Sequence, residues 1–230
     1  MKLMLKIALA SVLVAGVGSA NAGLVIFSSV GGAPTGATKW NLDSPTTLPS
    51  EVSYVSWTPD AAFVTGSASG VYAAPYLSGN NGVGFGSPNQ ANGQDLTQYI
   101  TTGSTGAYAN AKVDIGFSAD QLYFGLLWGS VDTYNTLKFF DGATLVGTIT
   151  GSDVTPTATG DQGMNGTFYV NINSDVGFNK VEFTSSQYAF EFDNLAFSQQ
   201  SQVPEPATLG LLGLGLAGLG FARRRKQKAA

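Results

Sequence analysis

The stretch "QLYFGLLWGS", Gln121–Ser130, decides the fold class of this chain. It is almost continuously apolar from Leu122 to Trp128, which is typical of a central β-strand covered on both faces. Immediately before it, "KVDIGFS" places Val113, Ile115 and Phe117 in alternation with polar residues and glycine. That period of two predicts a half-buried strand, so both segments favour a β domain.

The rest of residues 23–202 has the same character, with short apolar runs separated by Gly, Ser, Thr and Asn. Asp141 and Gly142 lie between two strand-like runs and predict a hairpin. We expect about eight to ten strands and an all-β, two-sheet β-sandwich of jelly-roll type, without internal repeats. Residues 79–105 are expected to contain a long surface loop, and Leu96 and Tyr99 lie in the one segment that could form a short helical turn.

The first 22 residues have the three parts of a secretory signal peptide. Lys2 and Lys6 form its basic start, and Ile7–Val17 is its apolar stretch. Small residues, Ala20 and Ala22, mark the cleavage site, which places the mature start at Gly23.

The last 28 residues differ just as clearly from the polar middle of the chain. Ala207–Ala222 carries no charge, and a basic cluster follows it: Arg223, Arg224, Arg225, Lys226 and Lys228. The uncharged run is slightly shorter than the roughly 20 residues that span a bilayer, so we expect a short transmembrane helix. Positive flanks stay cytoplasmic, which leaves residues 23–202 on the other side of that membrane.

Between the domain and this run stand Val203, Pro204, Glu205 and Pro206. The two prolines favour an extended backbone that a processing enzyme can reach. The order "VPEP", apolar run and "RRRKQK" resembles the PEP-CTERM sorting signal of bacterial surface proteins handled by exosortases. An ordinary C-terminal membrane anchor is the alternative.

This resemblance implies recognition by a membrane-embedded, transpeptidase-like exosortase and removal of the tail near Pro204–Pro206. It also implies export, with a transient stage in the inner membrane of a Gram-negative bacterium that makes exopolysaccharide. The surface or extracellular matrix is the expected destination. A second resemblance rests on "LLWGSVDTYNTLKFFDG", Leu126–Gly142, and on "TGSDV", Thr150–Val154. Both stretches look like a group of exosortase-dependent surface proteins without an assigned enzymatic activity.

Composition limits the chemistry open to the domain. The chain has neither cysteine nor histidine, which excludes disulfides, thiolate nucleophiles and the usual general base near neutral pH. Residues 23–202 carry four lysines and no arginine against fourteen acidic residues, a formal net charge of −10. Such a domain is a poor partner for nucleic acid or anionic membranes.

Two glutamates in the last strands are candidate ligand or catalytic residues. A simple hairpin turning at Ser186 and Gln187 would place Glu182 opposite Glu191 and Lys180 opposite Asp193. A facing pair of glutamates could serve acid/base chemistry on a glycosidic bond, or could bind a structural calcium ion. The first expectation, however, is that both point apart on a solvated face, as exposed acidic residues usually do.

The stretch "EFDNLAF" shifts its alternation, which predicts a β-bulge at Asp193 and Asn194. Aromatic side chains offer stacking surfaces for sugars, and Trp40 and Trp57 are the better candidates for exposure. Trp128 is expected in the core. For Trp40 and Trp57 as well, core or ordinary packing is the first expectation, and an exposed stacking surface is the alternative.

The sequence thus predicts an exported, non-enzymatic surface or matrix protein that contacts exopolysaccharide and carries no metal cofactor. The alternative is a polysaccharide-active enzyme, a glycoside hydrolase or lyase that uses carboxylates.

Overall fold

The computed structural model describes residues 24–29, 32–44, 47–58, 60–87, 92–103, 111–187 and 189–202. The proposed signal peptide and the segment from Val203 onward lie outside this part of the chain. No helix within the described ranges is long and apolar enough to cross a membrane.

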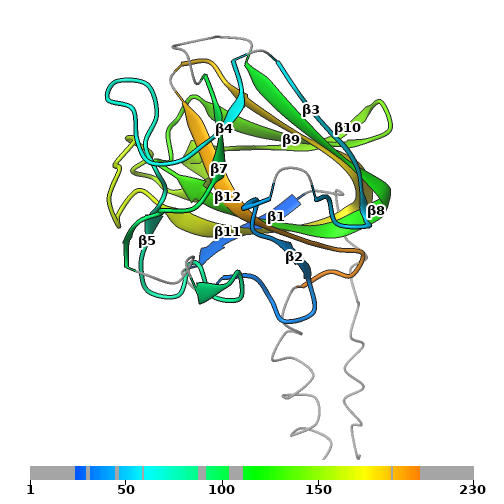
Figure 1. Cartoon of the computed structure of the whole chain (residues 1–230). Coiled ribbons are helices and arrows are strands. Elements are labelled where there is room, and N and C mark those ends of the chain that lie inside the picture. The colour runs from blue at the N-terminus through cyan, green and yellow to red at the C-terminus, as the bar shows by residue number, and fades with distance from the viewer. Residues whose placement is uncertain are drawn as a thin grey trace, which may run out of the picture.

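The described residues form strands and one short helix (Figure 1). In chain order these are β1 (Leu24–Ser29), β2 (Thr38–Trp40), β3 (Val52–Trp57), β4 (Ala62–Val64), β5 (Tyr76–Leu77), β6 (Gly93–Gln94), β7 (Tyr99–Thr102), β8 (Lys112–Gly129), β9 (Asn135–Asp141), β10 (Thr144–Thr150), α1 (Gly151–Val154), β11 (Phe168–Ser185) and β12 (Phe190–Ser198). All strand pairings are antiparallel. This confirms the all-β prediction.

Ten strands belong to one sheet with the order β10-β9-β11-β8-β12-β7-β4. The strand β1 also pairs with β11, β2 with β12, and β3 with β8. The short strands β5 and β6 form a separate two-stranded sheet.

Two long strands fold the main sheet over on itself. β8 and β11 pair from Lys112 opposite Thr184 to Trp128 opposite Phe168, with register shifts after Asn173. In β8 the shift coincides with three exposed residues, Ser118–Asp120, in a strand that is otherwise mostly buried. Bulged, irregular pairing bends a strand, and Figure 1 shows β8 turning through such a bend at the right of the view. Each of the two strands therefore contributes one half to each layer of a sandwich.

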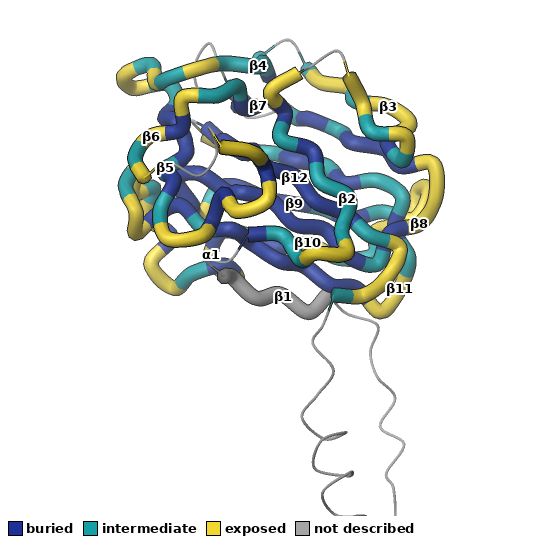
Figure 2. Tube along the Cα trace, turned by 60° about the horizontal axis from the view of Figure 1, so that its bottom comes forward, coloured by how far each residue is buried: buried dark blue, intermediate teal, exposed yellow. Residues whose placement is uncertain are grey.

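Aromatic rings fill the space between the layers. Phe183 of β11 stacks on Phe192 of β12, with ring centroids 3.9 Å apart and an interplanar angle of 14°. The two strands are not neighbours in the sheet, so this contact joins the layers. Trp128 stacks on Phe190 in the same core and is fully buried, as predicted. Figure 2 shows buried residues along the middle of the strands and exposed ones mainly at the turns and the rim.

Several local predictions are confirmed. The segment Leu122–Trp128 is a central strand flanked on both sides, and its residues other than Leu122 are buried. β9 and β10 form the predicted hairpin, where Gly142 has a φ of +56° that favours glycine. A register shift follows Asp193, and Asn194 has a φ of +53°, which matches the predicted bulge.

Other predictions are wrong. "KVDIGFS" and "QLYFGLLWGS" are one continuous strand, because Ser118–Asp120 stay in the ladder at the bend. Tyr99 begins the strand β7 instead of a helical turn. The loop expected within residues 79–105 is present in the described residues before β6, and the strands β6 and β7 follow it. The jelly-roll topology and the terminal helices stay predictions.

Candidate functional site

The chain between β4 and β7, of which the structure describes residues 65–87 and 92–98, packs on the outer side of one layer. We call it the covering segment, and it lies near Gly129, the last residue of β8. Pro75 packs directly on Gly129, and a side chain at that glycine would meet the proline at 3.1 Å. The backbone N–H of Asp95 donates to the carbonyl of Pro75 at 2.8 Å, which ties the segment to its own return strand. Ala73 and Ala74, which precede Pro75, are buried as well. The covering segment thus packs over the start of β12.

Glu191, from β12, lies beneath the covering segment and is only 2% exposed. Its Oε1 accepts a 2.8 Å hydrogen bond from the backbone N–H of Ala73, and its Oε2 accepts a 2.7 Å bond from the Ser130 hydroxyl. Burial raises the pKa of Glu191 to about 7, and the charge of Asp132 adds to the shift. The bonds from Ser130 and Ala73 oppose that shift without cancelling it. Near neutral pH this carboxyl can therefore either donate or accept a proton.

Asp132 belongs to the loop that follows β8. It is 6% exposed, and burial raises the pKa of its carboxyl. Across from it, Gly160 has a φ of +71°, and a side chain at this glycine would meet Oδ1 of Asp132 at 2.5 Å. The tight approach fixes the aspartate against the strip Thr159–Gly160, which pairs with it through an isolated β-bridge.

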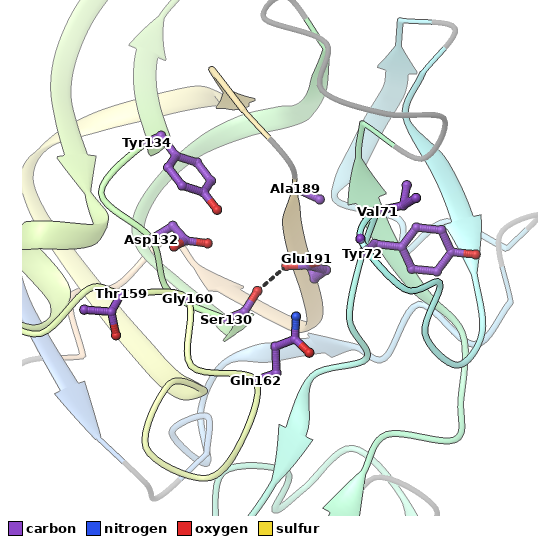
Figure 3. Close-up of a pocket in the computed structure, with 11 residues that line it drawn as sticks. Val71, Tyr72, Ser130, Asp132, Tyr134, Thr159, Gly160, Gln162, Ala189 and Glu191 are labelled. Carbon is purple, nitrogen blue, oxygen red and sulfur yellow. Dashed lines mark hydrogen bonds between the residues drawn. The ribbon is translucent and has the colours of Figure 1, made fainter.

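The pocket between these elements has a volume of about 220 Å³. Its lining residues come from the covering segment, the loop between β8 and β9, the loop between α1 and β11, and the beginning of β12 with the residue before it. They are Gly70, Val71, Tyr72, Ser130, Asp132, Tyr134, Thr159, Gly160, Gln162, Ala189 and Glu191. Figure 3 shows the polar ends of Tyr134, Asp132, Ser130, Gln162 and Glu191 pointing toward a common centre. Hydroxyl, amide and carboxyl groups arranged in this way suit a small polar ligand.

The predicted pairing of Glu182 with Glu191 is wrong. The strand β8 lies between β11 and β12, so Glu182 is opposite Asp114 and Lys138, while Glu191 is opposite Gly129 and Thr101. The carboxylate of Glu182 instead contacts the ammonium groups of Lys112 and Lys138, each at 3.3 Å. Partial burial acts in the opposite direction, but the two lysines lower the pKa of Glu182. Glu182 is thus part of a surface ion-pair network.

Asp193 is fully buried, on the side of its layer that the covering segment packs against. No hydrogen-bond donor among the described residues reaches either of its carboxylate oxygens, nor Oδ2 of Asp95. Burial and the adjacent carboxyl of Asp95 raise the pKa of Asp193. In the described part of the chain, no group of three or more acidic side chains is placed to hold a metal ion. A structural calcium ion stays a prediction.

The two tryptophan candidates differ in the structure. Trp40 is 5% exposed and belongs to the core, in agreement with ordinary packing, so it offers no stacking surface to a ligand. It lies on β2 opposite Leu195 of β12, and both residues belong to the core between the layers. Trp57 is 48% exposed, which corresponds to the alternative interpretation of this residue, and meets the Phe63 ring edge-on with centroids 5.7 Å apart. Only Trp57 keeps a free face for a ligand.

Sequence reasoning missed Ser130, Asp132 and Tyr134. All three follow the buried strand β8 directly, in "GSVDTYN". Polar side chains just after a buried strand are a usual place for binding residues, and that signal was present. Their convergence on Glu191, which is 59 residues further along than Asp132, depends on the pairing of β8 with β12.

A second cavity of about 280 Å³ lies beside the end of β12. Glu51 lines it, with Oε1 accepting a 2.9 Å bond from the Thr38 hydroxyl and Oε2 accepting from Ser50. Glu51 is the only acidic residue that lines this cavity, whereas the first pocket has two, Asp132 and Glu191.

The structure defines an all-β domain whose last described residue, Gln202, leads into the C-terminal segment. Residues 202–226 match the family model of the PEP-CTERM protein-sorting motif. The chain therefore carries a PEP-CTERM sorting signal, which implies export to the cell surface through processing by an exosortase. No match was found among curated proteins or solved structures.

Proposed function

We propose that this protein is a non-enzymatic component of the cell surface or extracellular matrix, and that its pocket holds a sugar residue of an exopolysaccharide. In this proposal the precursor passes through the inner membrane of a Gram-negative bacterium and loses its tail near Pro204–Pro206. The domain 23–202 then acts outside the cell, where biofilm polysaccharide is available. The two long strands shared by both layers support a sandwich of jelly-roll type as part of this proposal.

The observation that carries the proposal is the convergence of polar groups around Glu191. Its carboxyl is oriented by Ser130 and Ala73, while Asp132, Tyr134 and Gln162 point into the same space. The pocket volume of about 220 Å³ is below the roughly 300–1,000 Å³ typical of drug-sized ligands, so it suits a single sugar ring. The exposed ring of Trp57 offers a separate stacking surface for a longer chain.

A second candidate function is hydrolysis or lysis of a polysaccharide by the same carboxyls. The specific observation in its favour is the pKa of about 7 for Glu191, next to a second carboxyl, Asp132. A glycosidase acid must keep its proton near neutral pH while its partner acts as base or nucleophile.

One experiment separates the two candidates. The mature protein is tested on the host's exopolysaccharide and on a glycan array, both for binding and for release of reducing ends. Glu191→Gln and Asp132→Asn are compared with Asp175→Asn, which removes an exposed acid at the strand bend. Binding without product, abolished by the two pocket variants alone, supports the proposal. Product formation that disappears in both pocket variants would show an enzyme instead.

A further inference from the structure

The pocket has an unusual charge. Two of its lining residues are acidic, Asp132 and Glu191, and none is basic. The titratable groups that face Glu191 are Asp132 and Tyr134 from the loop after β8, and Tyr99 from β7. All of these are anionic or neutral, so no residue that the structure describes supplies a cation to this space.

The lysines of the domain are engaged elsewhere. Lys112 and Lys138 contact Glu182, and Lys112 also contacts Asp114 at 3.0 Å. The ammonium of Lys180 lies 3.9 Å from the centre of the Phe140 ring, and Lys39 approaches Gly84. With the chain's arginines confined to its last residues, no cation of the domain is left to balance the pocket.

Burying two carboxyls near each other disfavours their ionised forms, and a bound cation reverses that effect. We propose that the ligand of this pocket is the protonated amine of a 2-amino sugar residue in a polysaccharide. This inference rests on the proposed function and adds the chemical class of its ligand. The same sugar with an acetylated or hydroxyl-bearing carbon 2 lacks the charge and is the disfavoured ligand.

The groups in the pocket match both the ammonium group and the ring hydroxyls of such a sugar residue. An ammonium has three donors and no acceptor, and the two carboxyls supply acceptors for it. Ser130 and Gln162 present a hydroxyl and an amide toward the same centre, where they can bond the ring hydroxyls. Gly160 approaches Asp132 so closely that a side chain at this glycine would clash with the carboxyl group.

Binding of the amine should release protons from the protein. About half of the Glu191 carboxyls are protonated at pH 7, given their pKa of about 7, and an adjacent ammonium stabilises the ionised form. Glucosamine binding measured by calorimetry at pH 7, in two buffers of different ionisation enthalpy, should therefore show release of up to about half a proton.

The decisive experiment compares three oligosaccharides that differ only at carbon 2: oligomers of glucosamine, of N-acetylglucosamine and of glucose. The mature protein should bind the glucosamine oligomer at least tenfold more tightly than the other two. Asp132→Asn and Glu191→Gln should each remove that preference, while Asp175→Asn should keep it. Thermal unfolding of each variant confirms that it is folded.

Each other outcome has a defined meaning. Equal or tighter binding of the uncharged oligomers overturns the amino-sugar inference and leaves the proposed function standing. No binding of any oligomer or of the exopolysaccharide overturns the proposed function itself. Calcium chloride that binds alone through Asp132 and Glu191, and competes with no sugar, would show that the acids form a metal site and would also overturn the inference.

Discussion

The side-chain oxygen of Asn173 accepts a 2.7 Å hydrogen bond from the backbone N–H of Gln202. Asn173 also lies opposite Val25 in the β11–β1 ladder. One residue thus joins the first strand of the domain to the last described residue before the sorting segment. The exosortase motif therefore begins directly at the surface of the folded domain, without a free tether before it.

The bond from Gln202 predicts a local effect of Asn173→Ala. The variant loses this bond and the weaker one from the Ser201 hydroxyl, so the end of the chain should detach from β11. We expect faster hydrogen exchange of the Gln202 amide and a loss of about 1 kcal/mol or less in global stability. Asn179→Ala, at the exposed strand bend, is the control. Unchanged exchange at Gln202 would contradict the contact.

Glu191 predicts a pH dependence of stability. Its pKa is raised from 4.5 to about 7 by folding, so the folded state holds its proton more tightly than the unfolded state. Stability should therefore fall as the pH rises from about 4.5 to about 7, by roughly 3 kcal/mol for this group. In Glu191→Gln that part of the decline should be absent. Urea unfolding of both proteins at several pH values measures the difference, and parallel curves would contradict the burial of an ionisable Glu191.

Asp193 predicts a stabilising substitution. Asp193 lies beside the carboxyl of Asp95, and neither oxygen of Asp193 nor Oδ2 of Asp95 has a hydrogen-bond donor among the described residues, which costs stability when the groups are ionised. Asp193→Asn removes one charge and supplies an N–H₂ donor to Asp95. The melting temperature at pH 8 should rise. A lower melting temperature, together with loss of a calcium-dependent stabilisation seen in the parent protein, would instead show that Asp193 binds a cation.

The contact between layers predicts a severe effect of Phe183→Ala. This ring is fully buried and stacks on Phe192, so its removal leaves a cavity between the layers. The free energy of unfolding should fall by about 3–5 kcal/mol. The control, Leu145→Ala, changes a side chain that is 52% exposed. It should change the free energy of unfolding by less than about 0.5 kcal/mol. Chemical denaturation that finds similar losses for both variants would contradict the layered packing.

The sequence was sufficient for features set by neighbouring residues. The apolar run to Trp128, the turn at Gly142 and the bulge at Asp193 follow from local periodicity and turn chemistry, and the structure contains all three. Strand order does not follow from such local patterns. Glu182 and Glu191 were paired on the assumption that adjacent strands form a hairpin, whereas β8 lies between them.

The candidate site depended on the same long-range pairing. Nothing near Glu191 in the sequence indicates Ser130, Asp132 or the backbone of Ala73, because these meet only when β8 pairs with β12 and the covering segment closes over both. Local sequence likewise left two interpretations of Trp40 open. Its polar neighbours made exposure an alternative to ordinary packing, and the pairing of β2 with β12 places the ring in the core.

The most direct test of the central claim is mass spectrometry of the protein recovered from the cell surface. We expect a C-terminal peptide that ends within or before Val203–Pro206 and no peptide containing "RRRKQK". Deletion of the exosortase should restore the uncleaved tail in the membrane fraction. A surface form whose peptides extend through Lys228 would contradict sorting by exosortase cleavage.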